Sequence, residues 1–424
     1  MKINNFIILI LLFIYIQISI CSHIVYPFKK STKEIKSYPE DLLQNDLEIT
    51  IEIGSPPQKV DINLRSKVYA IFVANSEAGL PYPTYNEQNS KNFVKLSKLI
   101  NFRNQEFEQG YKIYESFLIN EKEIKSISLV LATKVAYNEA GALGLRLLKS
   151  HEFGGNLSFI YQIKQPANLD NYAFTLRFEN DNNGELIIGS YPHLYDSNFN
   201  EKNFFFSRAR NIGSTIDWVL DFDAIKYDNK TIKNIITKSL IQIEFGLIQA
   251  PLPVKKFFIE TYFSNRCKEE FYNKRNITII HCDKSFDITS FKKLSFILKD
   301  IDYEFVLTYK DLFIEKDNEF IFGIVFENTT FKENPHWILG KPFIKKYQLV
   351  YDLDKKIIGL YKNNNNEKTK FNMNIVYISI LFILFIIAVT LIIYFIYIFK
   401  KKRKNKAFEL DDDNFDYTPT NIND

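Results

Sequence analysis

Residues 337–362 read WILGKPFIKKYQLVYDLDKKIIGLYK and carry two clear local signals. KPF at 341–343 is a turn signal, because proline fixes φ and often stands where regular structure changes direction. YQLVYDL at 347–353 alternates apolar and polar side chains with a period close to that of a β-strand. This stretch therefore predicts a turn followed by strands.

The same short alternating runs recur along the chain and predict a mostly-β protein. We expect strands at LEITIEI (47–53), KVDINL (59–64), SLVLA (128–132), FTLRF (174–178), ELIIG (185–189) and YEFVLTY (303–309). Turn signals such as GSPP at 54–57 and NNG at 182–184 separate these runs. Few stretches look helical, VKKFFIETYF at 254–263 being one of them. No fixed repeat of about 20–50 residues appears, which argues against a propeller or a solenoid.

Both ends of the 424-residue chain are apolar and differ from the polar region between them. Residues 1–21 combine one lysine, a short apolar run and small residues near Cys21, which predicts a cleaved signal peptide. Residues 375–399 are 25 uncharged residues, long enough to cross about 30 Å of hydrocarbon as a helix. We therefore expect a single-pass membrane protein.

Charges around the predicted helix indicate its orientation. Five basic residues follow it directly, from Lys400 to Lys404, so the positive-inside rule places the tail at 400–424 in the cytoplasm. Residues 363–374 form a polar stalk. The body between the two apolar ends would then lie in the lumen or outside the cell, on the secretory or endolysosomal route or at the cell surface.

Composition excludes some classes of ligand. The net charge of +4 is not concentrated on one segment of the body, so we expect no nucleic-acid partner. The five histidines are scattered and show no HExxH or CxxC spacing. We expect no metal and no cofactor.

Cysteine use and glycosylation signals agree with a secretory compartment. Once Cys21 is removed with the signal peptide, Cys267 and Cys282 remain, and in an oxidising lumen they are expected to form a disulfide. Sequons predict N-linked glycans at four positions, namely Asn156, Asn229, Asn276 and Asn328.

In order, the segments of the body resemble a pepsin-like aspartic peptidase. The resemblance begins at LEITIEIGSPPQ (47–58) and continues through GALGLRLL (141–148), NLSFIYQI (156–163), YAFTL (172–176), GELIIGSYPHLY (184–195) and WVLDFDAIKY (218–227). It ends at WILGKPFIKKYQLVYDLDKKIIGLYK, which is similar to the family's C-terminal signature. It implies a two-lobed β-barrel fold with a central cleft, with a short basic segment at 22–46, an N-terminal lobe at 47–200 and a C-terminal lobe at 201–362.

The resemblance also implies chemistry that depends on two aspartates. In this family one aspartate from each lobe shares a proton with the other, and the ionised one activates a water molecule. The first aspartate position corresponds to Arg65, whose guanidinium cannot act as a base. Lys67 takes the place of the motif glycine, so the turn must be rebuilt or strained if it needs a positive φ.

The second aspartate position lies in SLIQIEFGLIQAPLPVKKFF (239–258) and has two possible alignments. Matching Gly246 and Pro253 to the motif puts Glu244 at the aspartate position, and we prefer this alignment. Using Pro251 instead puts Gln242 there. In either case the position holds no aspartate, and a catalytically inactive fold is the simplest interpretation. A more specific hypothesis is that Arg65 and Glu244 form a buried ion pair.

The family's flap over the cleft maps onto FEQG at 107–110, with Phe107 where the family has tyrosine. On this alignment Phe107, Gly110 and Gly246 are candidate binding residues.

Two functions remain open. The first is a catalytically silent body that binds an extended peptide or protein segment in its cleft through backbone hydrogen bonds. The second is an active aspartic-type endopeptidase with an altered site. Residues 22–46 are shorter than a usual inhibitory propeptide but could still cover the cleft.

Overall fold

The computed structural model describes residues 23–32, 37–101, 107–135, 139–147, 158–212, 215–233, 235–263, 266–328, 336–362, 390, 393–398 and 400. Residues 1–362 form one compact unit, and residues 363–424 form a second unit. The first unit is mostly β. The predicted signal peptide, stalk and tail lie outside the described residues, apart from Lys400.

Among the described residues, the largest sheet has 14 strands in the order β12-β29-β28-β10-β11-β1-β2-β3-β9-β4-β8-β7-β5, with β6 paired to β7. Its strands are β1 (Ile24–Lys30), β2 (Leu47–Ile53), β3 (Gln58–Arg65), β4 (Ile71–Ala74), β5 (Val94–Lys95), β6 (Ile100–Asn101), β7 (Phe107–Ile119), β8 (Lys122–Val135), β9 (Gly141–Gly144), β10 (Ala173–Phe178), β11 (Asn183–Ile188), β12 (Phe204–Arg208), β28 (Val350–Asp352) and β29 (Ile357–Tyr361). The last strands of the chain therefore join the sheet of the N-terminal half.

Three further sheets lie in the C-terminal half. The first runs β15-β18-β27-β19-β26-β21-β25-β24 with β20 paired to β21, the second runs β17-β16-β22-β23, and the third pairs β13 with β14. Their strands are β13 (Asn211–Ile212), β14 (Thr215–Ile216), β15 (Val219–Asp221), β16 (Ala224–Tyr227), β17 (Lys230–Thr231), β18 (Lys238–Ile241), β19 (Ile248–Ala250), β20 (Cys267–Tyr272), β21 (Ile277–Asp283), β22 (Leu294–Leu298), β23 (Tyr303–Leu307), β24 (Phe313–Lys316), β25 (Glu319–Phe322), β26 (Ile324–Glu327) and β27 (Trp337–Leu339).

Short helices connect the strands. They are α2 (Glu40–Leu43), α3 (Phe159–Ile163), α4 (Pro192–Tyr195), α5 (Leu252–Phe258), α6 (Tyr309–Leu312) and α7 (Lys341–Tyr347). The helical prediction at 254–263 is confirmed by α5 and the π-helical turn η4 (Ile259–Phe263) that follows it. Single 3-10 turns are η1 (Ser76–Ala78), η2 (Glu87–Asn89), η3 (Glu201–Asn203), η5 (Ile288–Ser290) and η6 (Lys299–Ile301).

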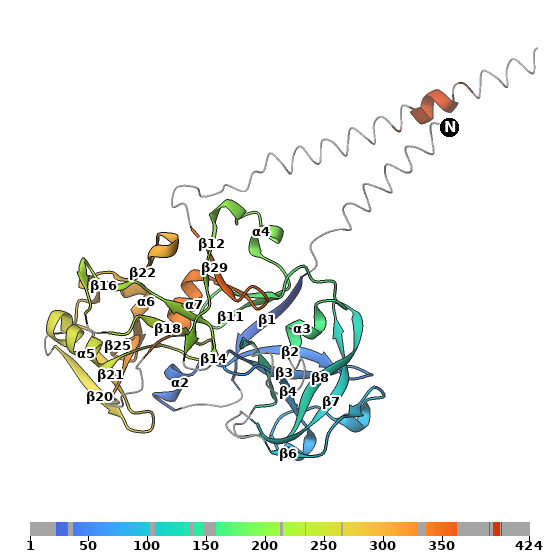
Figure 1. The fold of residues 1–424 in the computed structure, drawn as a ribbon, viewed down its shortest axis with the longest axis horizontal. Helices are drawn as coiled ribbons and strands as arrows, with labels where there is room; N and C mark the ends of the chain where they lie inside the picture. The colour runs from blue at the N-terminus through green and yellow to red at the C-terminus, as the bar shows by residue number, and fades with distance from the viewer. Residues whose placement is uncertain are drawn as a thin grey trace, which may run out of the picture. The chain divides into compact units, whose positions relative to one another are not determined.

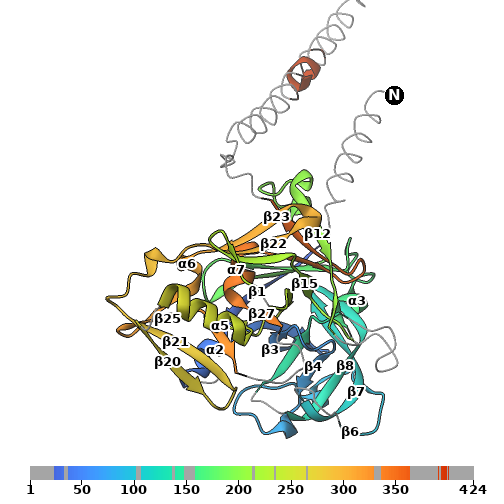
Figure 2. The same ribbon diagram turned by 60° about the vertical axis from the view of Figure 1, so that its left-hand side comes forward.

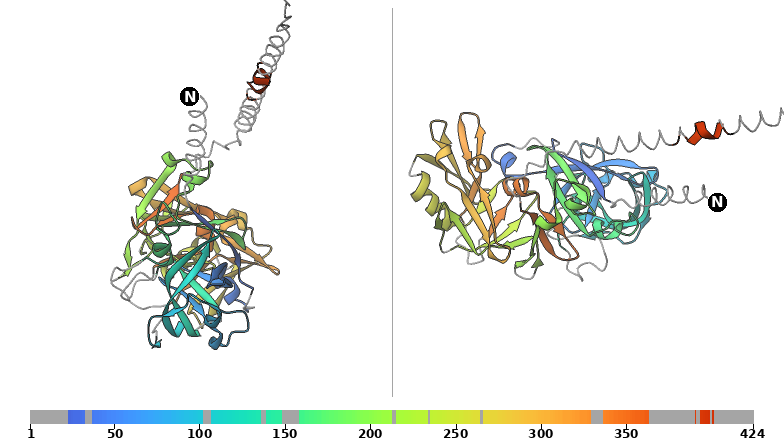
Figure 3. Two further views of the ribbon diagram at one scale, coloured as in Figure 1. Left: turned by 90° about the vertical axis from the view of Figure 1, so that its right-hand side faces the viewer. Right: turned by 90° about the horizontal axis from the view of Figure 1, so that it is seen from above.

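The two halves of the body form separate groups of strands. Figure 1 shows β2, β3, β4, β7 and β8 together on one side and β20, β21 and β25 on the other, with β18 and α7 between them. Figure 2 shows the same separation of β3, β4, β7 and β8 from β20, β21 and β25. The view from above in Figure 3 separates the same two groups by colour, blue to teal and yellow to orange. Buried apolar side chains from both halves belong to one large cluster that includes Trp218 and Trp337.

The segment before β2 belongs to the sheet. β1 lies between β11 and β2 and pairs antiparallel with both, for example Tyr26 with Leu186 and Phe28 with Ile49. Phe28 is buried against Phe178, with ring centroids 5.1 Å apart. These contacts make residues 24–30 a strand of the main sheet. These residues therefore cannot act as a detachable segment that covers the cleft.

Candidate functional site at the junction of the two halves

One strand arrangement occurs twice in the body. In the N-terminal half β3 runs parallel to β9, β9 runs antiparallel to β4, and β4 runs parallel to β8. In the C-terminal half β18, β27, β19 and β26 repeat these pairings in the same order and sense. The ends of β3 and β18 are therefore equivalent positions.

The register of the two copies identifies equivalent residues. Leu64 pairs with Leu143, and Ile241 pairs with Leu339, so the next residues, Arg65 and Gln242, correspond to one another. Gly144, which pairs with Arg65, and Gly340, which follows Leu339, both lie against backbone. A Cβ on Gly144 would come within 2.5 Å of the Ala70 carbonyl oxygen, and one on Gly340 within 2.2 Å of the Leu247 carbonyl oxygen.

Arg65 is held by two carboxylates of its own half. Its side chain is buried, and Nη2 lies 2.9 Å from Oδ1 of Asp46. The same nitrogen donates to Oε1 of Glu139. Asp46 immediately precedes β2 and Glu139 precedes β9, so the strands on either side of β3 present their acids to the guanidinium.

Glu244 contacts the N-terminal half through Ser66. The Ser66 hydroxyl donates to Oε2 of Glu244 at 2.6 Å, and the Ser66 amide donates to the same oxygen at 3.0 Å. The hydroxyl also accepts a hydrogen bond from the Ile243 amide at 3.1 Å. The other oxygen of Glu244, Oε1, is buried and has no hydrogen-bond partner among the described residues.

The ion pair between Arg65 and Glu244 does not form, although both residues are described. Arg65 instead contacts Asp46 and Glu139, and Glu244 accepts hydrogen bonds from Ser66. The physical reason is that two carboxylates already lie beside Arg65, because Asp46 and Glu139 stand just before β2 and β9, the two strands that flank β3.

Residues 38–46, the crossing segment, contact the loop after β18. The Asn45 side chain donates to the Ile243 carbonyl oxygen at 2.9 Å, and the Asn45 amide donates to the Glu244 carbonyl oxygen at 3.0 Å. The Gly246 amide donates to the Leu43 carbonyl oxygen at 2.9 Å. The crossing segment therefore lies along residues 243–246.

Side chains anchor the crossing segment to the hairpin of β20 and β21. The buried Glu40 carboxylate accepts hydrogen bonds from Arg275 at 2.6 Å and from the Tyr272 hydroxyl at 2.9 Å. Burial alone would raise the pKa of Glu40, but these donors outweigh it and lower the pKa to about 2. The Tyr38 hydroxyl lies 2.7 Å from Nε2 of His281, and burial together with Glu270 raises the pKa of Tyr38.

A model of the family described as eukaryotic aspartyl protease matches residues 48–363. The chain belongs to this family. The match extends through both copies of the strand arrangement, which is the duplicated core on which an aspartyl protease places its two catalytic loops. No curated protein matches the chain significantly.

In an aspartyl protease the two acids occupy equivalent positions, so the register decides between the two alignments of the second loop. Gln242 is the counterpart of Arg65, whereas Glu244 is the counterpart of Lys67. The preferred alignment on Glu244 is thereby corrected to its alternative, Gln242. Neither Lys67 nor Glu244 adopts a positive φ, so these turns are built without a glycine or the strain considered above.

The three predicted binding residues are all buried against other parts of the fold, and their role in binding stays a prediction. Phe107 is 2% exposed and packs against Phe72, with ring centroids 4.8 Å apart, so it does not cover a cleft. The strands β6 and β7 pair before and after residues 102–106, which puts the tip of this hairpin outside the described residues.

Gly110 and Gly246 serve close backbone approach. A Cβ on Gly110 would lie 2.5 Å from the Leu131 carbonyl oxygen in the neighbouring strand β8. A Cβ on Gly246 would lie 2.0 Å from the Leu42 carbonyl oxygen. The crossing segment therefore covers Gly246, and neither glycine offers an open surface at its α-carbon.

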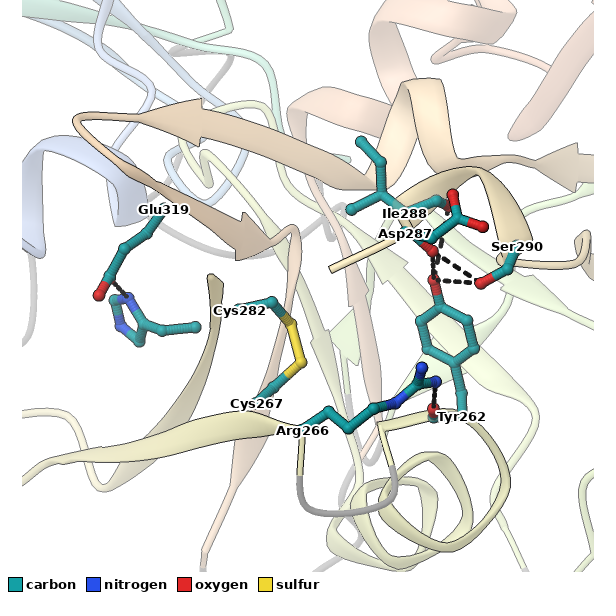
Figure 4. The surroundings of a disulfide bond; sticks show 9 residues. Tyr262, Arg266, Cys267, Cys282, Asp287, Ile288, Ser290 and Glu319 are labelled. Atoms are coloured by element: carbon teal, nitrogen blue, oxygen red, sulfur yellow. Dashed lines mark hydrogen bonds and ion pairs between the residues drawn. A yellow bond between two sulfur atoms is a disulfide. The ribbon is translucent and has the colours of Figure 1, made fainter. Parts of the chain in front are cut away.

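The predicted disulfide between Cys267 and Cys282 is confirmed. It joins β20 to β21, where the two cysteines face one another in the strand register. Figure 4 shows the disulfide with Glu319 on one side of it. On the other side is a hydrogen-bond network in which the Tyr262 hydroxyl donates to the Asp287 carbonyl oxygen at 3.3 Å.

The predicted glycosylation sites differ in accessibility. Asn229 is exposed, whereas Asn276 and Asn328 are partly buried. The side-chain amide of Asn328 donates to the Thr278 hydroxyl at 2.9 Å. Asn156 lies outside the described residues, and glycosylation at all four positions stays a prediction.

Most of the predicted membrane helix at 375–399 is also outside the described residues. None of the helices in the described part of the chain has the length and apolar character needed to cross a bilayer.

The sequence analysis missed Asp46, Glu139, Ser66 and Asn45 as residues of the junction. One signal could have identified the duplicated core: ALG at 142–144 and ILG at 338–340 end equivalent strands. Aligning the two halves on these glycines would have identified Gln242 as the position equivalent to Arg65.

Proposed function

We propose that this aspartyl protease homologue is catalytically inactive and binds a peptide or protein segment in the secretory pathway or at the cell surface. The observation that carries the proposal is the fixed cation at the junction. Arg65 occupies the first acid position, and Gln242 occupies the second. A guanidinium retains its protons and an amide does not ionise, so this pair cannot share and transfer a proton.

The remaining acids at the junction support the same proposal. Asp46 and Glu139 both contact Nη2 of Arg65, so a permanent positive charge lies between two carboxylates. In the active family the shared proton lies between the two motif aspartates, whose positions here are taken by Arg65 and Gln242, and its transfer is part of the chemistry. Glu244 accepts two hydrogen bonds from Ser66 and lies in the turn position that glycine occupies in the family.

Peptide binding is supported by what the junction retains. The core that supports the family's catalytic loops is complete, and Glu244 Oε1 is an acceptor with no partner among the described residues. A peptide N–H is the kind of donor that such an oxygen would accept, because a buried unpaired carboxylate oxygen is costly. Extended peptides bind in this way, mainly through backbone hydrogen bonds.

We further propose that the body is held at a membrane. The apolar run at 375–399, the basic residues after it and the predicted signal peptide support this topology. The disulfide agrees with an oxidising compartment. The predicted stalk at 363–374 would place the body close to the bilayer.

A second candidate function is peptide hydrolysis at a displaced acid pair. It is favoured by one observation, that Asp46 and Glu139 approach the same nitrogen atom and so lie near each other. Hydrolysis by Asp46 and Glu139 would require the Arg65 guanidinium to move away from both carboxylates, so that they could share a proton.

Both candidates can be tested by incubating the purified full-length protein with a library of peptides. The proposal predicts that the protein retains a subset of peptides and returns them uncleaved, as measured by mass spectrometry of the bound fraction. Glu244→Gln should alter the retained subset. Retention of no peptide by the folded protein would contradict the binding function, and cleaved products would support the second candidate.

A further inference from the structure

A pocket of about 490 Å³ opens beside the crossing segment, between α2, α6 and α7. Figures 1 and 2 show these three helices near one another in the C-terminal half. The polar wall includes five lysines, which are Lys30, Lys310, Lys341, Lys345 and Lys346. It also includes four acids, which are Asp41, Asp181, Asp311 and Glu315.

Every acid of this pocket already has a lysine partner. Asp41 pairs with Lys316 at 2.8 Å and Asp311 with Lys346 at 2.6 Å. The other two pairs are Asp181 with Lys345 and Glu315 with Lys284. Two of these partners, Lys316 and Lys284, lie outside the pocket lining. Each of the four carboxylates is thus paired with one lysine, and the remaining lysines of the wall add positive charge to the pocket.

Three lysines of the pocket have no ion pair among the described residues, namely Lys30, Lys310 and Lys341. Lys310 is exposed, so water can solvate its ammonium group. Lys30 and Lys341 are partly buried, and Lys30 makes only a 3.4 Å hydrogen bond to the Asp41 carbonyl oxygen. The two partly buried ammonium groups therefore lack a counterion.

The backbone brings these two lysines to one place. The Lys30 amide donates to the Asn182 carbonyl oxygen at 2.6 Å, next to Asp181 in the turn between β10 and β11. Lys345 pairs with Asp181 from α7, and Lys341 lies one helical turn before Lys345 on the same face. The Asp181 carboxylate therefore pairs with Lys345 and also interacts electrostatically with Lys341 and Lys30, which helps to hold the pKa of Asp181 below its usual value.

The electrostatic consequence is visible at Lys341. Burial lowers its pKa, Asp181 opposes this effect, and repulsion from Lys30 and Lys345 lowers the pKa further. An added anion would relieve this repulsion. The site therefore favours a ligand with negative charge.

The other wall of the pocket restricts the class of ligand. It contains apolar side chains, namely Leu42, Phe313, Ile314 and Pro342. A peptide can place an apolar side chain against this wall beside a carboxylate, which inorganic phosphate cannot do. We propose that this pocket binds an acidic peptide segment, with its carboxylate on Lys30 and Lys341 and a neighbouring apolar side chain against Leu42 and Phe313.

This inference is independent of the proposed function. The pocket does not include Arg65, Gln242 or Glu244, and a peptide could bind there whether or not the junction hydrolyses peptide bonds. A failure here would leave the junction proposal untouched.

The test is a fluorescence-polarisation titration of the purified full-length protein with labelled Gly-Glu-Leu-Glu-Phe-Gly. The matched probe is Gly-Gln-Leu-Gln-Phe-Gly. We expect saturable binding of the acidic probe, weakened at least about tenfold by Lys341→Met, by Lys30→Met or by the amide probe, since a hydrogen bond to a charged group is lost each time. Added salt should also weaken binding.

Lys256→Met is the matched control, because Lys256 is exposed on α5 and lies outside the pocket. The Lys256→Met protein should bind the acidic probe with the same affinity as the unaltered protein. Lys341→Met should keep the melting temperature, because it removes a partly buried charge that has no ion-pair partner. Equal affinities for Lys341→Met and the unaltered protein, or no binding of the acidic probe, would overturn the proposal. Inorganic phosphate binding more tightly than the peptide would overturn the assigned ligand class.

Discussion

Ser66 and Glu244 join the two halves of the body, with the Ser66 hydroxyl 2.6 Å from the Glu244 carboxylate. The same hydroxyl accepts from the Ile243 amide, so one small side chain satisfies two groups of the opposite loop. An ordinary surface serine would not have this role. The contact explains why a glutamate can occupy a turn position where the family has glycine.

Ser66→Ala should therefore destabilise the body by about 1–3 kcal/mol, because it leaves the buried Ile243 amide without its acceptor and removes one of the two hydrogen bonds to Oε2 of Glu244. Urea denaturation followed by tryptophan fluorescence measures this change. Ser197→Ala is the control, because Ser197 is exposed and makes no side-chain hydrogen bond among the described residues. Equal stability of the two variants would argue against the contact.

Arg65→Met should be more damaging, because it leaves the partly buried acids Asp46 and Glu139 next to one another without their cation. The expected loss is about 3–5 kcal/mol, the range for breaking one partner out of a buried pair. Thermal denaturation measures it. Adding Asp46→Asn and Glu139→Gln should recover part of the loss.

Arg210→Met provides the control for this experiment. Arg210 lies 4.0 Å from Asp300, and both side chains are largely exposed. Its removal should change stability by less than about 1 kcal/mol. An Arg65→Met protein as stable as this control would contradict the buried network.

Glu40 gives the crossing segment a defined dependence on pH. Its pKa is lowered in the folded protein from an ordinary 4.5 to about 2, so its ionised form stabilises the fold. That contribution is complete above pH 4.5 and is lost as pH falls towards 2. The stability difference between the unaltered protein and Glu40→Gln should therefore shrink over this window.

Urea denaturation at pH 5.5 and at pH 2.5 measures this difference. Glu260→Gln is the control, because Glu260 is exposed and lies 3.8 Å from an exposed lysine. Its difference from the unaltered protein should stay small at both values. A Glu40→Gln difference that is independent of pH would show that the ion pair with Arg275 does not stabilise the fold.

Removal of the disulfide by a double substitution, Cys267→Ala with Cys282→Ala, should lower stability by about 3 kcal/mol in the chain-entropy model. The two cysteines are 15 residues apart, so the closed loop is short, and the antiparallel pairing of β20 with β21 still connects the hairpin without the disulfide. Denaturation under non-reducing conditions measures the change. A reducing agent should destabilise the unaltered protein but not the double variant.

Local structure was largely predictable from the sequence. The run LEITIEI at 47–53 coincides with β2, and FTLRF and ELIIG fall in β10 and β11. Alternation identified these strands because apolar residues stand at every second position in the sequence, although the fold buries most of the intervening positions as well. The helix at α5 was recognisable by the same reasoning from its apolar side chains.

The partners of Arg65 were not predictable in this way. Glu139 is 74 residues away along the chain, and periodicity says nothing about which distant carboxylate meets a buried cation. The order of β3, β9 and β4 in the sheet brings them together. The choice between Gln242 and Glu244 likewise required the register of β18 against β27, because a shift of two residues preserves the strand's face.

The central claim is that Arg65 and Gln242 have replaced the acid pair of an aspartyl protease. Hydrolysis of a peptide library between pH 3 and pH 7, measured by mass spectrometry on the purified full-length protein, tests it most directly. We expect no cleavage beyond that of a heat-denatured sample. Pepstatin-sensitive cleavage that disappears in Glu139→Gln or Asp46→Asn would contradict it.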